Sequence, residues 1–154
     1  GKFRGKSLPE IIFVDADYFF YAFENNFFHY DLAKEAHELY KRARSIWVPS
    51  RNGQKMLVQY FFDYNPKSKK EEFSMMKLIP DGSDLMLPNV SPWIDFFVPR
   101  SRSHVDKNGY TNFVGALKEI LFGNRSYRMN RQACELFFNR QRYFDLRRVK
   151  EMQL

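Results

Sequence analysis

Cysteine and histidine are scarce in this sequence of 154 residues, which has one cysteine, Cys134, and three histidines, His29, His37 and His104. A lone cysteine forms no intramolecular disulfide, and histidines so far apart lack the spacing of a zinc finger. There is no apolar run of the roughly 18 residues that span a bilayer, and charged residues follow Gly1 at once. We therefore expect a cytoplasmic protein in a reducing compartment, with no membrane contact, no metal and no cofactor.

The sequence also lacks the motifs of common catalytic sites. It contains no Walker-type or dinucleotide-type glycine pattern, and no histidine lies near Cys134 along the chain to activate its thiol. A nuclease would need clustered carboxylates to hold Mg²⁺, but Asp15 and Asp17 suit helix caps and Asp81 suits a turn. We expect no catalytic residue and keep a metal-dependent nuclease as an alternative.

Aromatic and basic residues, by contrast, are abundant. The chain has 17 Phe, 9 Tyr and 2 Trp, and its formal net charge is +7. Residues 123–154 contain eight Lys and Arg but three acidic residues, so five of the seven excess positive charges lie there. This balance favours a polyanionic partner, either a nucleic acid or an acidic protein surface. So many aromatic residues imply either exposed rings that stack on a partner or a very aromatic core.

Helical patterns follow the first eight residues. A first helix can begin at Pro9, and Asp15 or Asp17 can cap a second helix over residues 18–28. A third helix is predicted over residues 31–45, where apolar residues recur at helical spacing. The buried face of the second helix would consist of Phe19, Phe23 and Phe27.

The middle of the chain alternates short runs of β-branched and aromatic residues with turn sequences such as Arg51-Asn52-Gly53. An antiparallel meander is the simplest arrangement of such strands. Residues 100–109 are polar and are predicted to form an exposed loop. The predicted strands span residues 46–48, 55–64, 72–79 and 93–98.

Two helices are predicted at the C-terminal end. One begins at Thr111 or Asn112 and ends before Gly123, and the other spans residues 127–148. The predicted fold class is α+β, with an N-terminal basic ribbon and helices, a central antiparallel β-meander and a C-terminal helical pair. We expect one compact domain over residues 1–154, with a ribbon-helix segment at 1–28, a β-rich middle at 46–98 and a helical part at 111–148.

The first 28 residues follow an ordered pattern. The segment GKFRGK at residues 1–6 alternates basic and small residues, and Asp15 and Asp17 precede an aromatic run at residues 18–23. This pattern resembles the small exodeoxyribonuclease-X-like C-terminal domain, a family that also includes quorum-sensing-regulated virulence factors. Family members usually have Trp where Tyr21 stands. The resemblance implies contact with nucleic acid, DNA rather than RNA, and transfers no catalytic residue, because the nuclease activity belongs to a separate domain.

Two groups of cations are the candidate nucleic-acid contacts. The first group lies on the ribbon, where neighbouring glycines let a phosphate backbone approach closely. The second group belongs to the C-terminal region, where basic residues recur with Glu135 and Asn139 at steps of three and four and would form one helical stripe. The candidate residues are Lys2, Arg4, Lys6, Arg125, Arg128, Arg131 and Arg142.

Both groups also have a simpler interpretation. Charged residues at a sheet edge prevent aggregation, and a polar helix stripe is often only a solvated face. We predict a non-catalytic nucleic-acid-binding protein, with DNA favoured over RNA by the resemblance. The alternative is a protein-interaction module or inhibitor that covers an acidic surface of another protein.

Overall fold

The computed structural model describes residues 3–82, 87–102 and 107–154. It confirms the α+β class, with an antiparallel strand meander and helices in the C-terminal part. The helices are α1 (Leu8–Glu24), α2 (Asp31–Ala43), α3 (Lys107–Phe122), α4 (Arg131–Asn139) and α5 (Leu146–Glu151), with short 3₁₀ helices at Val98–Ser101 and Gln141–Tyr143. The strands are β1 (Ile46–Trp47), β2 (Met56–Asn65), β3 (Lys70–Pro80), β4 (Val90–Ser91) and β5 (Trp93–Ile94).

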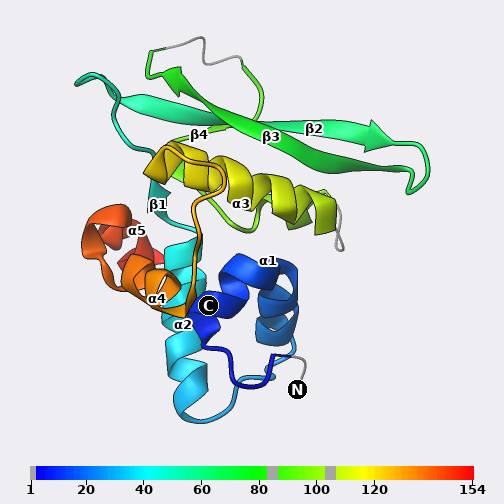
Figure 1. Ribbon diagram of the computed structural model, residues 1–154, viewed down its shortest axis with the longest axis vertical. Coiled ribbons are helices and arrows are strands. Elements are labelled where there is room, and N and C mark those ends of the chain that lie inside the picture. Colours follow the sequence, from blue (N-terminus) through cyan, green and yellow to red (C-terminus); the bar gives the residue numbers. More distant parts are fainter. Residues whose placement is uncertain (1–2, 83–86, 103–106) are drawn as a thin grey trace.

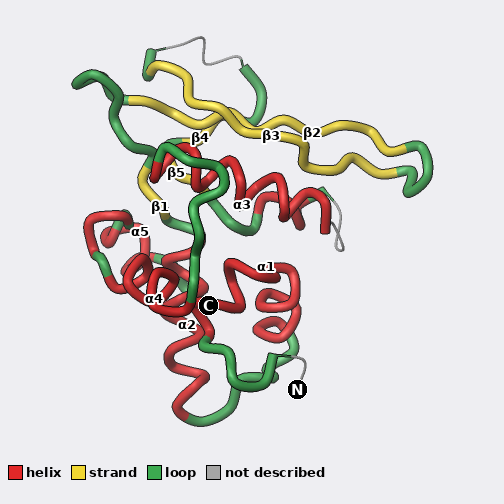
Figure 2. The backbone as a smooth tube through the Cα atoms, viewed as in Figure 1, coloured by secondary structure: helices red, strands yellow, loops and turns green. Residues whose placement is uncertain are grey.

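The sheet and most of the helices lie at opposite ends of the molecule (Figure 1). The three-stranded sheet has the order β3-β2-β4, and α3 lies along one of its faces. The helices α1, α2, α4 and α5 gather at the other end. Between them, β1 and β5 form a short antiparallel pair in which Ile46 lies opposite Ile94 (Figure 2).

Phenylalanine rings connect these parts through the core. Phe13 of α1 packs edge to face against Phe96 and Phe137, at 5.5 Å between ring centroids in each case. Phe113 of α3 lies 5.0 Å from Phe96 and 5.6 Å from Phe73 of β3. All five rings are buried, and each edge-to-face pair adds roughly 0.5–1.5 kcal/mol to the burial of its area. Much of the aromatic excess therefore fills the core.

α1 is kinked at Asp15, whose backbone (φ −156°, ψ 77°) is not helical. The carboxylate of Asp15 accepts a hydrogen bond from the backbone N–H of Tyr18 at 3.0 Å, so Asp15 caps the second half of the helix. That half ends at Glu24 instead of residue 28, because Asn26 adopts a left-handed conformation (φ 57°) that terminates helices. Phe27 consequently lies outside the helix and is 51% exposed, contrary to the predicted buried face.

The long strands β2 and β3 form an antiparallel hairpin. Val58, Tyr60 and Met76 on one face are buried, and Tyr60 lies opposite Met76. The register shifts between Phe61 and Phe62, where a β-bulge interrupts the ladder. The hairpin extends past the beginning of α3 in Figure 1, and Asn65 near its tip lines a pocket together with Asn108 and Asn112 of α3.

The predicted single helix over residues 127–148 is wrong. α4 begins at Arg131, where the side chain of Asn130 accepts a hydrogen bond from the N–H of Ala133 at 2.9 Å. The backbone turns to an extended conformation at Arg140 (φ −90°, ψ 105°), a short 3₁₀ helix follows at Gln141–Tyr143, and α-helix resumes only in α5. The break lets Phe144 enter the core, where it is 2% exposed and bridges to Ile46.

The exposed loop predicted over residues 100–109 is corrected at both of its ends, and residues 103–106 lie outside the described residues. Arg100 is buried, since its guanidinium binds Asp17 and donates to Glu24 of α1 at 2.9 Å. Two carboxylates of α1 therefore neutralise the buried charge of Arg100. The polar residues around Arg100 in the sequence had instead predicted that it is exposed. α3 already begins at Lys107, before the predicted cap at Thr111 or Asn112.

Candidate nucleic-acid interface

The N-terminal cations lie on a turn. Lys2 is outside the described residues, while Arg4 and Lys6 are exposed. The N–H of Lys6 donates to the carbonyl of Phe3 at 3.0 Å, and Gly5 has the positive φ of 85° that such a tight turn favours in glycine. In the described part, the predicted ribbon is thus a tight turn that leads into α1.

Arg131 joins this turn to the C-terminal helices. Its guanidinium donates to the carbonyl of Gly5 at 3.2 Å and to the carboxylate of Glu135 at 3.0 Å. Arg4, Lys6 and Arg131 consequently line one pocket of about 570 Å³, which we call the N-terminal pocket. Two cations predicted from the start of the chain and one predicted from its end are thus brought together.

Carboxylates moderate the charge of the N-terminal pocket. Lys6 forms an ion pair with Glu10 at 3.9 Å, and Arg131 lies between Glu10 at 3.9 Å and Glu135 at 3.0 Å. Arg4, by contrast, forms no ion pair with any residue that the structure describes. Because exposed ion pairs contribute little, Lys6 and Arg131 can exchange these partners for a phosphate at small cost.

A second pocket, of about 610 Å³, lies between α1 and α3, and we call it the α1–α3 pocket. Arg125 lines it together with Lys107 and Lys118 of α3. The sequence analysis missed the two lysines, although their spacing of eleven residues places them on one face of a helix. Asp15 and Asp17 at the kink of α1 form the opposite wall.

The loop of residues 123–130 connects the two pockets. It descends from the end of α3 to the start of α4, with Arg125 in the α1–α3 pocket and Arg131 just beyond its end in the N-terminal pocket (Figure 1). Arg128 lies between them on the loop and is exposed. Five of the predicted cations therefore form what we call the cationic path, consisting of Arg125, Arg128, Arg131, Arg4 and Lys6.

Arg142 lies apart from this path. It follows the break after α4, and its guanidinium lies 5.1 Å from the ring centroid of Tyr143. It lines neither the N-terminal pocket nor the α1–α3 pocket. The predicted stripe is therefore interrupted, because α4 spans only Arg131–Asn139, so that Arg131, Glu135 and Asn139 keep their helical spacing and Arg128 and Arg142 lie outside the helix.

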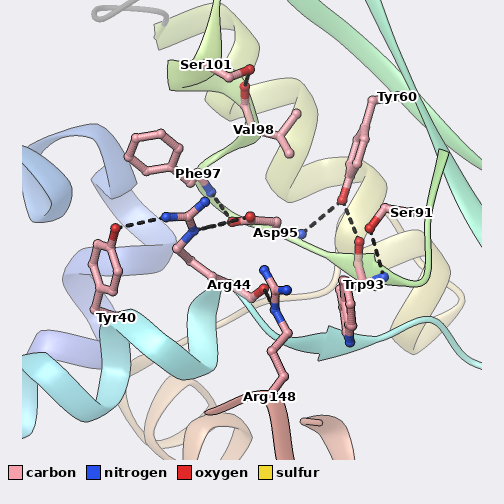
Figure 3. A network of polar contacts seen from close by, with 10 residues as sticks. All are labelled: Tyr40, Arg44, Tyr60, Ser91, Trp93, Asp95, Phe97, Val98, Ser101 and Arg148. Atoms are coloured by element: carbon pink, nitrogen blue, oxygen red, sulfur yellow. Dashed lines mark hydrogen bonds and ion pairs between the residues drawn. The ribbon is translucent and has the colours of Figure 1, made fainter. Parts of the chain in front are cut away.

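A buried polar network lies between the sheet and the helices (Figure 3). Arg44 pairs with Asp95 at 3.2 Å, and the hydroxyl of Tyr60 donates to the carbonyl of Trp93 at 2.7 Å and accepts from the N–H of Asp95 at 3.0 Å. Burial raises the pKa of Asp95, and the attraction of Arg44 offsets this only in part. These groups are occupied by one another, so the network holds elements together and is not a site.

The side chains considered as catalytic candidates are either buried or paired with other residues of the protein. Burial raises the pKa of the Cys134 thiol to about 12, which opposes formation of a nucleophilic thiolate. Among residues 3–82, 87–102 and 107–154, no group of three or more His, Cys, Asp or Glu could hold a metal ion. Asp81 instead pairs with Lys55 at 3.5 Å. No helix in this part of the chain has the length and apolar character to cross a membrane.

Comparison of the chain with protein-family models, with curated proteins and with solved structures finds no match. The resemblance of residues 1–28 to the exodeoxyribonuclease-X-like C-terminal domain therefore stays a prediction. The arrangement of the cationic path is therefore the main structural indication of function.

Proposed function

We propose that this protein binds nucleic acid through the cationic path, with single strands preferred over duplexes. The observation that carries the proposal is the contact of Arg131 with Gly5, which joins cations from the two ends of the chain in one pocket. Lys and Arg side chains that follow a surface in this way can contact successive phosphates and release counterions. The choice of DNA over RNA rests on the resemblance of residues 1–28.

The loop of residues 123–130 supports a preference for single strands. Tyr127 lies between Arg125 and Arg128 in the sequence and is 44% exposed. Its ring rests on Phe122, at 4.9 Å between centroids, which holds it in place for stacking. Cations that alternate with a supported aromatic ring are typical of proteins that bind single strands, where bases are free to stack.

The experiment is fluorescence anisotropy with labelled single-stranded and duplex DNA and RNA over a series of salt concentrations. Arg4→Gln combined with Arg128→Gln removes two exposed cations that form no ion pair within the described residues. Because each lost phosphate contact lowers the salt slope by about 0.7 for a single strand, we expect a slope smaller by about 1.4. Affinity should fall for every sequence alike, since phosphate contacts carry no sequence information.

The matched control is Arg147→Gln combined with Lys150→Gln, which removes the same charge from α5. Both residues are exposed, and α5 lines neither pocket of the cationic path. The control should keep the salt slope of the native protein within error. Equal losses in the two double variants would mean that net charge alone drives binding, and absence of binding at low salt would refute the proposal.

A second candidate function is protein interaction, because aromatic side chains are exposed at the end of α1 and on the turn between α1 and α2. Tyr21 and Phe27 pack edge to face at 5.6 Å, and Tyr30 is 95% exposed. Exposed aromatic side chains of this kind often anchor a protein partner. This function would be favoured by binding to a purified protein partner at moderate salt. The double variant Phe27→Ser with Tyr30→Ser should abolish that binding, whereas Arg4→Gln with Arg128→Gln should leave it unchanged.

A further inference from the structure

The α1–α3 pocket has the size and charge of a binding site for a small anionic group. Its volume of about 610 Å³ lies within the range of roughly 300–1,000 Å³ that is common for ligand pockets. Lys107, Lys118 and Arg125 contribute three cations to its lining. Within the part of the chain that the structure describes, none of these three side chains forms an ion pair, so their charge is available to a ligand.

The carboxylates in the same wall already have partners inside the protein. Asp15 accepts the hydrogen bond from the N–H of Tyr18 that caps the second half of α1. Asp17 binds the buried guanidinium of Arg100, which also contacts Glu24. Arg100 offsets part of the charge of Asp17, whereas Asp15 keeps its charge, and the three cations of the lining outnumber its two carboxylates.

Arg125 is held against the backbone of α3. A Cβ atom at Gly115 would lie 2.8 Å from both Cζ and Nε of Arg125, closer than atoms of this kind approach one another. The guanidinium thus occupies the space that a side chain at position 115 would need. Arg125 thereby lines the pocket together with Lys118, which follows Gly115 by three residues in α3.

We propose that the α1–α3 pocket binds the terminal phosphomonoester of a nucleic-acid strand or of a free nucleotide. This inference rests on the proposed nucleic-acid binding, because the pocket lies at one end of the cationic path. A phosphomonoester carries about −1.5 to −2 charges at pH 7, more than the single charge of a backbone phosphate, so three cations favour the strand end.

The rest of the pocket suits the nucleoside that carries the phosphate. Val14 is 59% exposed at the rim and offers an apolar surface to a base or a sugar. Ser126 contributes a hydroxyl beside Arg125 that can donate to a phosphate oxygen. Strand ends would therefore enter at Arg125 while the adjoining nucleotides follow Arg128 and Arg131 along the loop.

The test compares labelled single strands of one sequence with a 5′-phosphate, a 3′-phosphate or hydroxyl groups at both ends, measured by anisotropy. At least one phosphorylated strand should bind about tenfold more tightly than the hydroxyl strand. Lys107→Gln combined with Lys118→Gln, two lysines of the pocket that lie outside the cationic path, should abolish this preference and leave the binding of the hydroxyl strand nearly unchanged. The control Arg147→Gln with Lys150→Gln should keep the preference, and circular dichroism confirms folding of each variant.

Competition distinguishes the two sources of the phosphate and separates this inference from the proposed function. Displacement of the phosphorylated strand by a nucleoside monophosphate, but not by inorganic phosphate at the same concentration, supports a pocket for the nucleotide. Equal affinity for phosphorylated and hydroxyl strands overturns the inference and leaves nucleic-acid binding in place. Binding of the monophosphate without binding of any strand overturns the proposed function and retains the pocket as a nucleotide site, while binding of neither overturns both.

Discussion

The guanidinium of Arg148 lies over the indole ring of Trp93, 4.0 Å from its centroid. The indole N–H donates to the carboxylate of Asp145 at 2.9 Å, and Asp145 also accepts from the N–H of Arg148 as the cap of α5. Nε of Arg148 in turn donates to the carbonyl of Arg44 at 3.3 Å. The segment after the break in the C-terminal helices is thereby fixed to β5 and to the end of α2.

Replacing Trp93 by Phe should destabilise the protein by about 1–2 kcal/mol. The variant loses the hydrogen bond to Asp145 and part of the cation–π contact with Arg148. Urea unfolding measures the change in the free energy of unfolding. Trp47→Phe is the matched control, because Trp47 lies opposite Trp93 in the strand pair but is exposed, and it should change stability by less than about 0.5 kcal/mol.

Stability should depend on pH through Asp95. Because burial raises the pKa of its carboxyl above the ordinary value of 3.8, the folded state binds the proton more tightly than the unfolded state. The contribution of Asp95 to stability is therefore full below pH 3.8 and falls as the pH rises toward the folded-state pKa.

The stability of the native protein relative to Asp95→Asn should accordingly fall as the pH rises. Each unit by which the folded-state pKa exceeds the unfolded one corresponds to about 1.4 kcal/mol. Urea unfolding of both proteins at pH 4, 5, 6 and 7 isolates the effect of Asp95, because the other titrating groups are the same in both proteins and cancel in the difference. A difference that grows in favour of the native protein with rising pH would show that attraction by Arg44 outweighs the burial of Asp95.

Local patterns in the sequence predicted most of the elements. Runs of β-branched, aromatic and long apolar residues between turn sequences predicted β2 and β3, whose observed register places Tyr60 opposite Met76. A cap by Asp15 or Asp17 was also predicted, since a short polar side chain before an aromatic run marks a helix start, and the structure selects Asp15. These features depend on neighbours along the chain, so the sequence contains their signals.

Contacts between distant residues could not be predicted in the same way. Arg100 looked exposed because its neighbours in sequence are polar, but its partners Asp17 and Glu24 lie on α1. The end of α4 was missed because Phe144 gains more from burial beside Ile46 than residues 140–145 gain from continued helix. For the candidate site, each cation was found singly, whereas the contact of Arg131 with Gly5 depends on the fold.

Asn130→Ala should destabilise the protein by about 1 kcal/mol. The side chain of Asn130 accepts the N–H of Ala133 and caps α4 directly before Arg131. Without the cap, the beginning of α4 frays and Arg131 moves out of the N-terminal pocket. The affinity for single strands should therefore fall as well. Asn139→Ala, at the exposed other end of α4, is the control and should leave both quantities nearly unchanged in urea unfolding and anisotropy.

Gly115→Ala should separate stability from binding. The new methyl group meets the flexible end of Arg125 instead of backbone, so the side chain can swing away at little cost. Alanine also favours helix over glycine by up to about 1 kcal/mol, so stability should stay equal or rise. The displaced guanidinium no longer enters the α1–α3 pocket, and the preference for phosphorylated strands should fall several-fold.

A double-mutant cycle with Arg125→Gln gives the Gly115→Ala prediction its decisive control. If the methyl group acts only by displacing Arg125, it should have almost no further effect on phosphate preference once Arg125 is replaced. The two substitutions would then be strongly non-additive in anisotropy measurements while remaining nearly additive in urea unfolding. Additive losses of phosphate preference would instead mean that Gly115 itself lies at the ligand, where the methyl group blocks entry to the pocket regardless of the residue at position 125.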